Sequence, residues 1–161
     1  MNIIVAVAKN GVIGQGLEIP WHYPADFKWF KELTLHGVLI MGRKTFDSLP
    51  KKKLPQREII VVSRMFNFYP NQVGNLQDAC YLARTRWPEK KVWFAGGAQI
   101  YKEALDLKLV ERIYYTEIPE EPTIDENTIL FPKECLKGFG YETGYSNSDD
   151  TRLIHKTYRC L

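Results

Sequence analysis

Features typical of secreted, membrane-spanning and metal-binding proteins are scarce in this chain of 161 residues. It has only three cysteines, widely spaced, and such an odd set favours reduced thiols in the cytosol over a disulfide framework or a zinc site. The apolar run 3–8 is too short to span a bilayer, and no basic segment precedes it as in a signal peptide. The three histidines have no metal-ligand spacing. We therefore expect a cytoplasmic protein with no metal ion and no membrane partner.

Several common catalytic and nucleotide-binding motifs are also missing. The sequence contains no G-x-G-x-x-G, no G-x-x-x-x-G-K-[ST] and no G-x-S-x-G, so a standard Rossmann site, a P-loop and a serine nucleophile elbow are not supported. The net charge of +3 is too weak and scattered to indicate nucleic acid, although it suits an anionic small molecule. Without repeats, low-complexity tracts or linkers, residues 1–161 are expected to form a single domain.

Short apolar strands alternate with helical segments along the chain. We expect strands at 3–8, 38–41, 59–62, 92–95 and 110–118, helices at 24–35, 43–49, 76–87 and 98–105, and a hairpin of 140–145 with 152–158. The glycine-rich segment 9–23 is expected to be a functional loop. This alternation predicts an α/β fold with a largely parallel sheet, in which ligands bind at the carboxyl ends of the strands.

Asp26 is the first candidate for chemistry, because it lies close to the start of the helix expected at 24–35. Several aromatic residues, among them Trp21 and Phe30, are its neighbours in sequence. Burial among such rings raises the pKa of a carboxyl group toward the range that a proton donor needs. An acid in a first helical turn also stabilises the helix dipole, and for Asp26 considered alone this structural role is the better-supported interpretation.

Two glycine-containing turns and one basic cluster could bind an anionic ligand. The segment 42–45 (Gly-Arg-Lys-Thr) follows a strand and starts a helix, which suits phosphate, but a solvated basic turn explains it equally well. Gly96 and Gly97 allow a close backbone approach to a ligand, or simply an ordinary tight turn. The lysines 51–53 with Arg57 are either a solvated surface or an attraction for a carboxylate tail.

A series of short motifs occurs in a fixed order over essentially the whole chain. It runs from the apolar first strand with Ala6 through Gly11-Val12-Ile13-Gly14, Ile19-Pro20-Trp21, Pro24-Ala25-Asp26, Phe30, Thr34, Met41-Gly42-Arg43-Lys44-Thr45, Leu54-Pro55-x-Arg57, Ser63-Arg64 and Gly96-Gly97-Ala98-Gln99-Ile100-Tyr101 to Phe131-Pro132. Each motif is weak alone, but their order and the chain length together are specific. In this combination the chain resembles the bacterial dihydrofolate reductases.

The resemblance implies both a fold and a reaction. The fold would be a mainly parallel eight-stranded sheet flanked by about four helices. The reaction would be NADPH-dependent reduction of 7,8-dihydrofolate to tetrahydrofolate, with hydride transfer to C6 and protonation at N5, which supplies one-carbon metabolism. A monomer that binds no nucleic acid is expected.

The resemblance also implies catalytic and substrate-binding residues. Asp26 would hold the pteridine and assist its protonation through a water that Trp21 and Thr116 help to position, with Tyr101 close to both rings. Arg57 would bind the glutamate carboxylate of the folate. The substrate would contact Ile4, Ala6, Asp26, Phe27, Phe30, Leu49, Leu54, Arg57, Ala95 and Thr116.

A second group of residues is implied for NADPH. The backbones of Ala6 and Ile13 would contact the nicotinamide amide, Gly96 and Gly97 (joined by a cis peptide) would face the pyrophosphate, and the 2′-phosphate would lie near two arginines. The full set is Ala6, Ile13, Gly14, Gly42, Arg43, Lys44, Thr45, Ser63, Arg64, Gly96, Gly97, Ala98, Gln99, Ile100 and Tyr101.

Several positions depart from the family pattern, among them Ala95 and Thr128. Ala95 stands where a larger aliphatic residue is usual, and Thr128 where the family has an aspartate that braces a mobile loop.

Two other functions have to be considered. A related reductase could act on another pterin or on a flavin precursor, although Arg57 favours a substrate with a glutamate tail. A regulator that binds nucleotide or RNA could share the fold without the chemistry, but such a binder has no need of a buried acid at Asp26.

Overall fold

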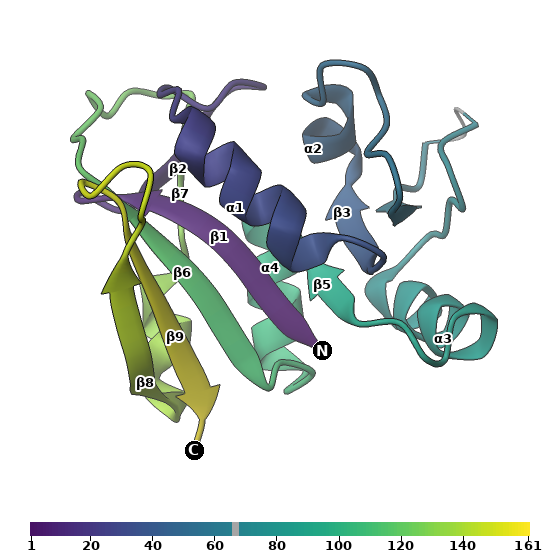
Figure 1. The fold of residues 1–161 in the computed structure, drawn as a ribbon. Helices are drawn as coiled ribbons and strands as arrows, with labels where there is room; N and C mark the ends of the chain where they lie inside the picture. Colours follow the sequence, from purple (N-terminus) through teal and green to yellow (C-terminus); the bar gives the residue numbers. More distant parts are fainter. Residues whose placement is uncertain (66–67) are drawn as a thin grey trace.

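Seven strands form one sheet in the computed structural model, which describes residues 1–65 and 68–161 (Figure 1). Their order across the sheet is β4-β3-β5-β1-β6-β9-β8. The bounds are β1 Asn2–Ala8, β3 Val38–Gly42, β4 Glu58–Val62, β5 Val92–Phe94, β6 Arg112–Ile118, β8 Phe139–Ser146 and β9 Ile154–Cys160. All pairings from β4 to β6 are parallel, and β9 and β8 add antiparallel strands at one edge. The predicted α/β fold with a mainly parallel sheet is therefore confirmed.

The sheet has seven strands among the described residues, not the eight that the family resemblance implied. Two further strands, β2 (Val12–Gln15) and β7 (Thr128–Leu130), pair with each other in a separate antiparallel sheet. Gly11, with a φ of +87°, turns the chain directly after β1, and its N–H donates to the carbonyl of Ala8. The segment predicted as a loop over 9–23 therefore contains a short strand that leaves the main sheet.

Four α-helices and one 3₁₀-helix complete the described elements. They are α1 Pro24–Thr34, α2 Arg43–Asp47, α3 Leu76–Arg86, α4 Ala98–Asp106 and η1 Lys133–Gly138. In Figure 1, α1 crosses one face of the sheet in front of β1, and α4 lies behind it. The apolar spacing that predicted α3 is confirmed, because Leu76, Ala79, Cys80 and Ala83 are its buried residues.

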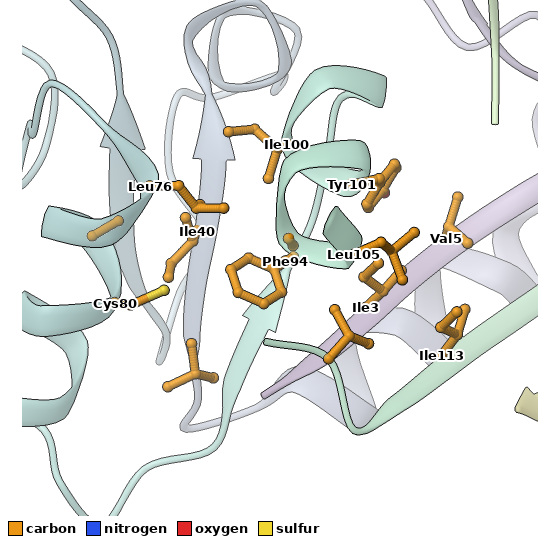
Figure 2. Packing of buried hydrophobic residues seen from close by; sticks show 14 of the residues in the cluster. Ile3, Val5, Ile40, Leu76, Cys80, Phe94, Ile100, Tyr101, Leu105 and Ile113 are labelled. Atoms are coloured by element: carbon orange, nitrogen blue, oxygen red, sulfur yellow. The ribbon is translucent and has the colours of Figure 1, made fainter. Parts of the chain in front are cut away.

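The central parallel strands are buried on both faces, which explains their continuous apolar sequences. On β1, Ile3 and Val5 pack with the cluster that includes α3 and α4, whereas Ile4 belongs to the cluster under α1 and α2. Figure 2 shows Tyr101 and Leu105 of α4 packed against β1, next to Phe94 of β5. Each fully buried large apolar side chain contributes roughly 1.5–3 kcal/mol, so the strand ends at the carboxyl edge are held by a rigid core.

Helix α1 is the element that brings Asp26 to the sheet. Pro24 occupies the first turn, where its missing N–H is not needed, and Asp26 lies in the same turn. The helix ends at Thr34, and the chain then turns back through His36, which has a φ of +63°, and Gly37, whose N–H donates to the Thr34 carbonyl over 2.9 Å. This tight exit fixes the far end of α1 against β3.

We expect Gly37→Ala to destabilise the protein. A Cβ at this position would lie 3.0 Å from the carbonyl oxygens of Lys91 and Thr34 and 3.1 Å from the Trp93 ring, and backbone atoms cannot move aside easily. Such overpacking costs roughly 1–3 kcal/mol in the free energy of unfolding, which urea denaturation measures. Gly74→Ala is the matched control, because nothing lies within 4 Å of its Cβ. Equal stability of the two variants would contradict this packing.

Candidate active site

Three adjacent strands bring one residue each to the same level of the sheet. Ala6 of β1 is in register with Thr116 of β6, and Thr116 is in register with His155 of β9. Asp26 reaches this row from α1 and forms a side-chain hydrogen bond with Thr116. The strand register and the first turn of α1 thus bring Asp26 and Thr116 together, two residues that the family resemblance implied for the site.

The environment of Asp26 raises the pKa of its carboxyl group from 3.8 to about 6. Desolvation by burial is the larger cause, and the hydrogen bond from Thr116 acts in the opposite direction. The backbone N–H of Asp26 donates to the Tyr23 carbonyl over 3.0 Å, which ties the residue to the start of the helix. Asp26 is therefore a half-buried acid that keeps its proton up to about pH 6.

A group of apolar side chains lies beside this acid. Five of the ten residues predicted to contact substrate belong to the cluster between α1, α2 and the sheet: Ile4, Phe30, Leu49, Leu54 and Ala95. Ala6 and Trp21 pack in a neighbouring small cluster around Tyr23. Phe27 is different, because 48% of its surface is exposed and its ring contacts His22 at 5.3 Å between centroids.

Arg57 lies at the end of this apolar group, directly before β4. Its Nη1 donates to the Thr34 hydroxyl over 3.4 Å and its Nε to the Pro55 carbonyl over 3.2 Å. The guanidinium carbon lies 5.8 Å from the centroid of the Phe30 ring. Burial lowers the pKa of Arg57 from its usual value, and an arginine side chain keeps its charge in proteins. The side chain is held in place with N–H donors to spare, since an arginine has five.

The two predicted glycine turns meet at the carboxyl ends of β3 and β5. The Gly42 N–H donates to the Gly96 carbonyl over 2.9 Å, and the peptide between Gly96 and Gly97 is cis, as expected. Gly96 has a φ of +114°, and an added Cβ would lie 3.3 Å from the Tyr101 hydroxyl and 3.4 Å from the Thr45 hydroxyl. Only glycine fits this position without strain.

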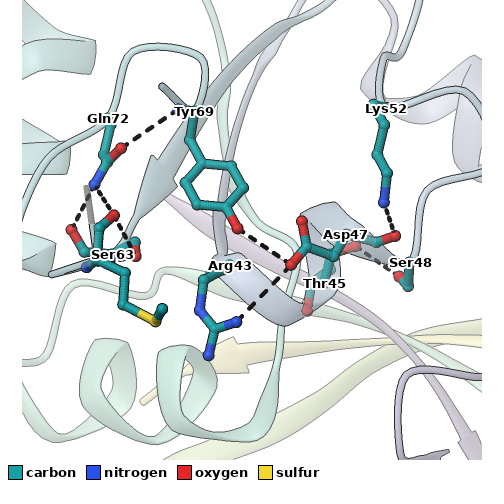
Figure 3. Close-up of polar contacts among 9 residues, drawn as sticks. Arg43, Thr45, Asp47, Ser48, Lys52, Ser63, Tyr69 and Gln72 are labelled. Carbon is teal, nitrogen blue, oxygen red and sulfur yellow. Dashed lines mark hydrogen bonds and ion pairs between the residues drawn. The ribbon is translucent and has the colours of Figure 1, made fainter. Parts of the chain in front are cut away.

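Polar contacts organise the basic residues beside these turns (Figure 3). Arg43 lies 3.9 Å from Asp47 in an ion pair, and the Tyr69 hydroxyl donates to Asp47 over 3.2 Å. Ser63 accepts from the Met65 N–H, and Gln72 donates to the Ser63 carbonyl. The structure thus anchors Arg43 in a network and ties Gln72 to Ser63, directly after β4.

The other residues predicted for the cofactor have varied surroundings. Lys44, Arg64 and Gln99 are exposed, whereas Thr45 and Ala98 are half-buried. Ile100 belongs to the main core, and Ile13 packs at its edge. Gly14 lies in β2, away from the main sheet.

Tyr101 is fully committed to a structural hydrogen bond. Its hydroxyl donates to the Ile4 carbonyl over 2.9 Å, and burial raises the pKa of the phenol well above its ordinary value. It therefore stays protonated and ties α4 to β1. Any role of Tyr101 near the nicotinamide and pterin rings would be one of positioning.

The sequence analysis missed His155 and Asn147, which are buried behind Thr116. His155 Nδ1 lies 2.7 Å from the Thr116 hydroxyl, and Asn147 Nδ2 lies 2.9 Å from His155 Nε2. Burial alternates along 153–157, so His155 points inward, but the residue types of this strand do not alternate between apolar and polar and gave no signal of it.

Comparisons with known proteins identify relatives of this chain. The sequence pattern of the family described as dihydrofolate reductase matches residues 1–155. The chain belongs to the dihydrofolate reductase family. Among its relatives, the dihydrofolate reductase of Neisseria gonorrhoeae is 43% identical over 124 residues, which cover 75% of each chain. That of Mycobacterium tuberculosis H37Rv is 39% identical over 123 residues, covering 73% of this chain and 71% of the relative.

A solved dihydrofolate reductase from Enterococcus faecalis, complexed with NADP(H) and RAB-propyl, superposes with a TM-score of 0.82 at 25% identity. The superposition covers 99% of this chain and 95% of the other. As a member of this family, the protein is an NADPH-dependent oxidoreductase that reduces dihydrofolate. In the ranges 1–65 and 68–161, none of the helices combines the length and apolarity that crossing a bilayer requires.

We expect Asp26→Asn to stabilise the dihydrofolate reductase fold at high pH. Because the pKa of Asp26 is raised to about 6, the folded protein binds a proton between pH 3.8 and about 6 that the unfolded chain has lost. Stability therefore falls as pH rises through this window, and above it the buried carboxylate costs on the order of 1–3 kcal/mol. Urea denaturation should show a more stable variant at about pH 8 and a smaller difference at about pH 4.

The control for this prediction is Asp106→Asn, since Asp106 is exposed in an ion pair with Lys102. It should show no gain that grows with pH. An Asp26→Asn protein that is less stable than the wild type at both pH values would contradict the burial of the carboxyl group.

Proposed function

We propose that Asp26 provides the acidic group for protonation of dihydrofolate at N5. The observation that supports this role most directly is a carboxyl group with a pKa of about 6, hydrogen-bonded to Thr116 at the carboxyl edge of the sheet. A group with this pKa keeps a useful protonated fraction near neutral pH. Asp26 holds the pteridine, and Trp21 and Thr116 hold the water through which the proton passes to N5.

The residues at the glycine turns fit NADPH. Gly96 has no side chain to obstruct a close approach to its backbone, and Gly97, the N-cap of α4, has no side chain to occupy the first N–H groups of that helix. These N–H groups suit the pyrophosphate oxygens. When bound, NADPH supplies the hydride that C6 receives. Arg43, Arg64 and Ser63 bind the 2′-phosphate, with Lys44 and Thr45 beside them.

The remaining part of the substrate extends over the apolar cluster toward Arg57. Phe30, Leu49 and Leu54 pack against its ring system, in keeping with their place in one cluster. Arg57 uses two of its donors within the protein, and the rest bind the glutamate carboxylate. This arrangement favours a folate over a pterin that lacks the tail.

We further infer that residues 1–161 form one domain that acts as a monomer in the cytoplasm, on small molecules and not on nucleic acid. The main sheet takes its central strand from the N-terminus and two edge strands from the C-terminus, which supports a single domain. Cys80, Cys135 and Cys160 are free thiols, which is typical of a reducing compartment.

The test of the proposed chemistry is the rate of hydride transfer by Asp26→Asn. An amide cannot release a proton, so we expect the single-turnover rate at about pH 7 to fall by roughly 10²-fold or more, with the remaining rate rising as pH falls. The loss of NADPH absorbance on mixing with dihydrofolate measures this rate. Asp106→Asn again serves as the control, and a full rate in Asp26→Asn would remove Asp26 from the mechanism.

The test of the substrate assignment is Arg57→Ala. Removal of a charged hydrogen-bonding partner should raise the KM for dihydrofolate by roughly 10–100-fold, which corresponds to about 1.5–3 kcal/mol. The KM for dihydrobiopterin, which has no glutamate, should stay the same. Lys53→Ala, a change in the neighbouring exposed cluster, is the control. If Arg57→Ala raises the KM for both substrates equally, Arg57 does not bind the glutamate tail.

A further inference from the structure

The polar side chains behind Asp26 form a continuous buried row. Thr116, His155 and Asn147 are 1%, 2% and 6% exposed, although each carries polar atoms that cost free energy when they are buried without partners. The distances along the row are 2.7 Å from Thr116 Oγ1 to His155 Nδ1 and 2.9 Å from His155 Nε2 to Asn147 Nδ2. The direction of these hydrogen bonds follows from the orientation of the Asn147 amide, at the end of the row away from Asp26.

The amide of Asn147 has a fixed orientation. Its Oδ1 accepts the backbone N–H groups of Asp149, over 2.8 Å, and Asp150, over 3.1 Å. Only an oxygen can accept these two bonds, so the nitrogen of the amide faces the histidine. This Nδ2 also lies 3.4 Å from the carbonyl of Ala25, a second acceptor. Asn147 is therefore a donor, and His155 Nε2 must be the acceptor.

A neutral imidazole with Nε2 as acceptor carries its proton on Nδ1. Burial keeps His155 neutral, because it lowers the pKa of the ring to about 4. The Nδ1–H then donates to the Thr116 oxygen, which leaves the hydroxyl proton of Thr116 free to point toward Asp26. The ring itself is held by Trp29, which stacks on it at 4.0 Å with an interplanar angle of 7°.

We propose that Asn147 and His155 are positioning residues that orient the Thr116 hydroxyl as a donor to Asp26. The row thus runs in one direction from the turn at 147–150 to the acid, and it favours the carboxylate form of Asp26 against the effect of burial. This inference rests on the proposed role of Asp26 as the acidic group.

Other titratable groups near the row have hydrogen-bond or ion-pair partners of their own. Tyr145 of β8 contacts His155 at 5.5 Å between ring centroids, and its hydroxyl accepts from Trp29 Nε1 over 2.8 Å. In the turn, Asp149 is paired with Lys28 and Asp150 with Arg152. Burial is the only cause that lowers the pKa of His155, so no neighbouring charge sets its protonation state.

The first experiment reads the tautomer of His155 directly in the wild-type protein. Nitrogen-15 NMR of the histidine rings distinguishes Nδ1–H from Nε2–H, and the latter is the more common form of free histidine in water. We expect His155 to be the neutral Nδ1–H tautomer from about pH 5 to about pH 8. An Nε2–H tautomer, or protonation of the ring within this range, would overturn the proposal. No variant has to fold for this result.

The second experiment follows the pH midpoint of hydride transfer. His155→Phe keeps a ring against Trp29 but removes the donor to Thr116, and it should raise the midpoint by about 0.5–1 pH unit, the equivalent of one hydrogen bond. Thr116→Val should raise it further. The double variant should match Thr116→Val alone, because both changes act through the same hydroxyl.

Thr157→Val is the matched control, since Thr157 is buried two residues further along β9 and is in register with Tyr114. It should leave the midpoint unchanged even where it lowers stability. A wild-type midpoint in His155→Phe, or additive shifts in the double variant, would overturn this inference alone. If Asp26→Asn keeps the wild-type midpoint, Asp26 is not the titrating group and both proposals are overturned.

Discussion

The hydrogen bond between Asp26 and Thr116 is the contact around which the rest of the site is arranged. It joins a helix to a strand that is distant in sequence, and it exists because α1 packs its apolar side across β1 while β6 lies beside β1 in register. Burial raises the pKa of the Asp26 carboxyl group, and the hydrogen bond from the Thr116 hydroxyl lowers it. The balance of these two effects holds the acid near a pKa of about 6, which is useful for proton transfer at neutral pH.

The same burial acts on His155 with the opposite sign. The pKa of Asp26 is raised to about 6, so its contribution to stability is lost as pH rises from 3.8 to about 6. The pKa of His155 is lowered to about 4, so its contribution is lost as pH falls from 6.5 to about 4. The two windows overlap, and the effects partly cancel in the free energy of unfolding. Between about pH 4 and about pH 6 the fold keeps a proton on Asp26 and keeps the imidazole of His155 neutral, although only the Thr116 hydroxyl separates the two groups.

Local sequence was sufficient to predict the elements that depend on local physics. The strands at 38–41, 59–62 and 92–95 were predicted within one residue at each end, because their apolar runs are buried on both faces and end in turns. Pro24 marked the start of α1 correctly. The pairing of β2 with β7 was not predicted, since its partners are more than 100 residues apart and the register shifts between Val12 and Gly14. Nothing in the sequence near residue 12 identifies that partner.

The residues of the site also divide into those that local sequence reveals and those that only the fold reveals. Asp26, Arg57 and the diglycine are recognisable because each belongs to a short motif. In the structure the diglycine follows the carboxyl end of β5, whereas Arg57 directly precedes β4 at the other end of the parallel strands. His155 belongs to no motif. Its importance depends on three facts that only the fold supplies: the register with Thr116, the stacking of Trp29, and the turn that fixes the amide of Asn147. A buried polar row of this kind is tolerated only when every member has a partner, since an unpaired group costs more free energy than an apolar one of the same shape. The fold therefore sets the direction of the hydrogen bonds along the row, just as it sets the packing of the core. The last hydrogen bond of the row is donated to Asp26.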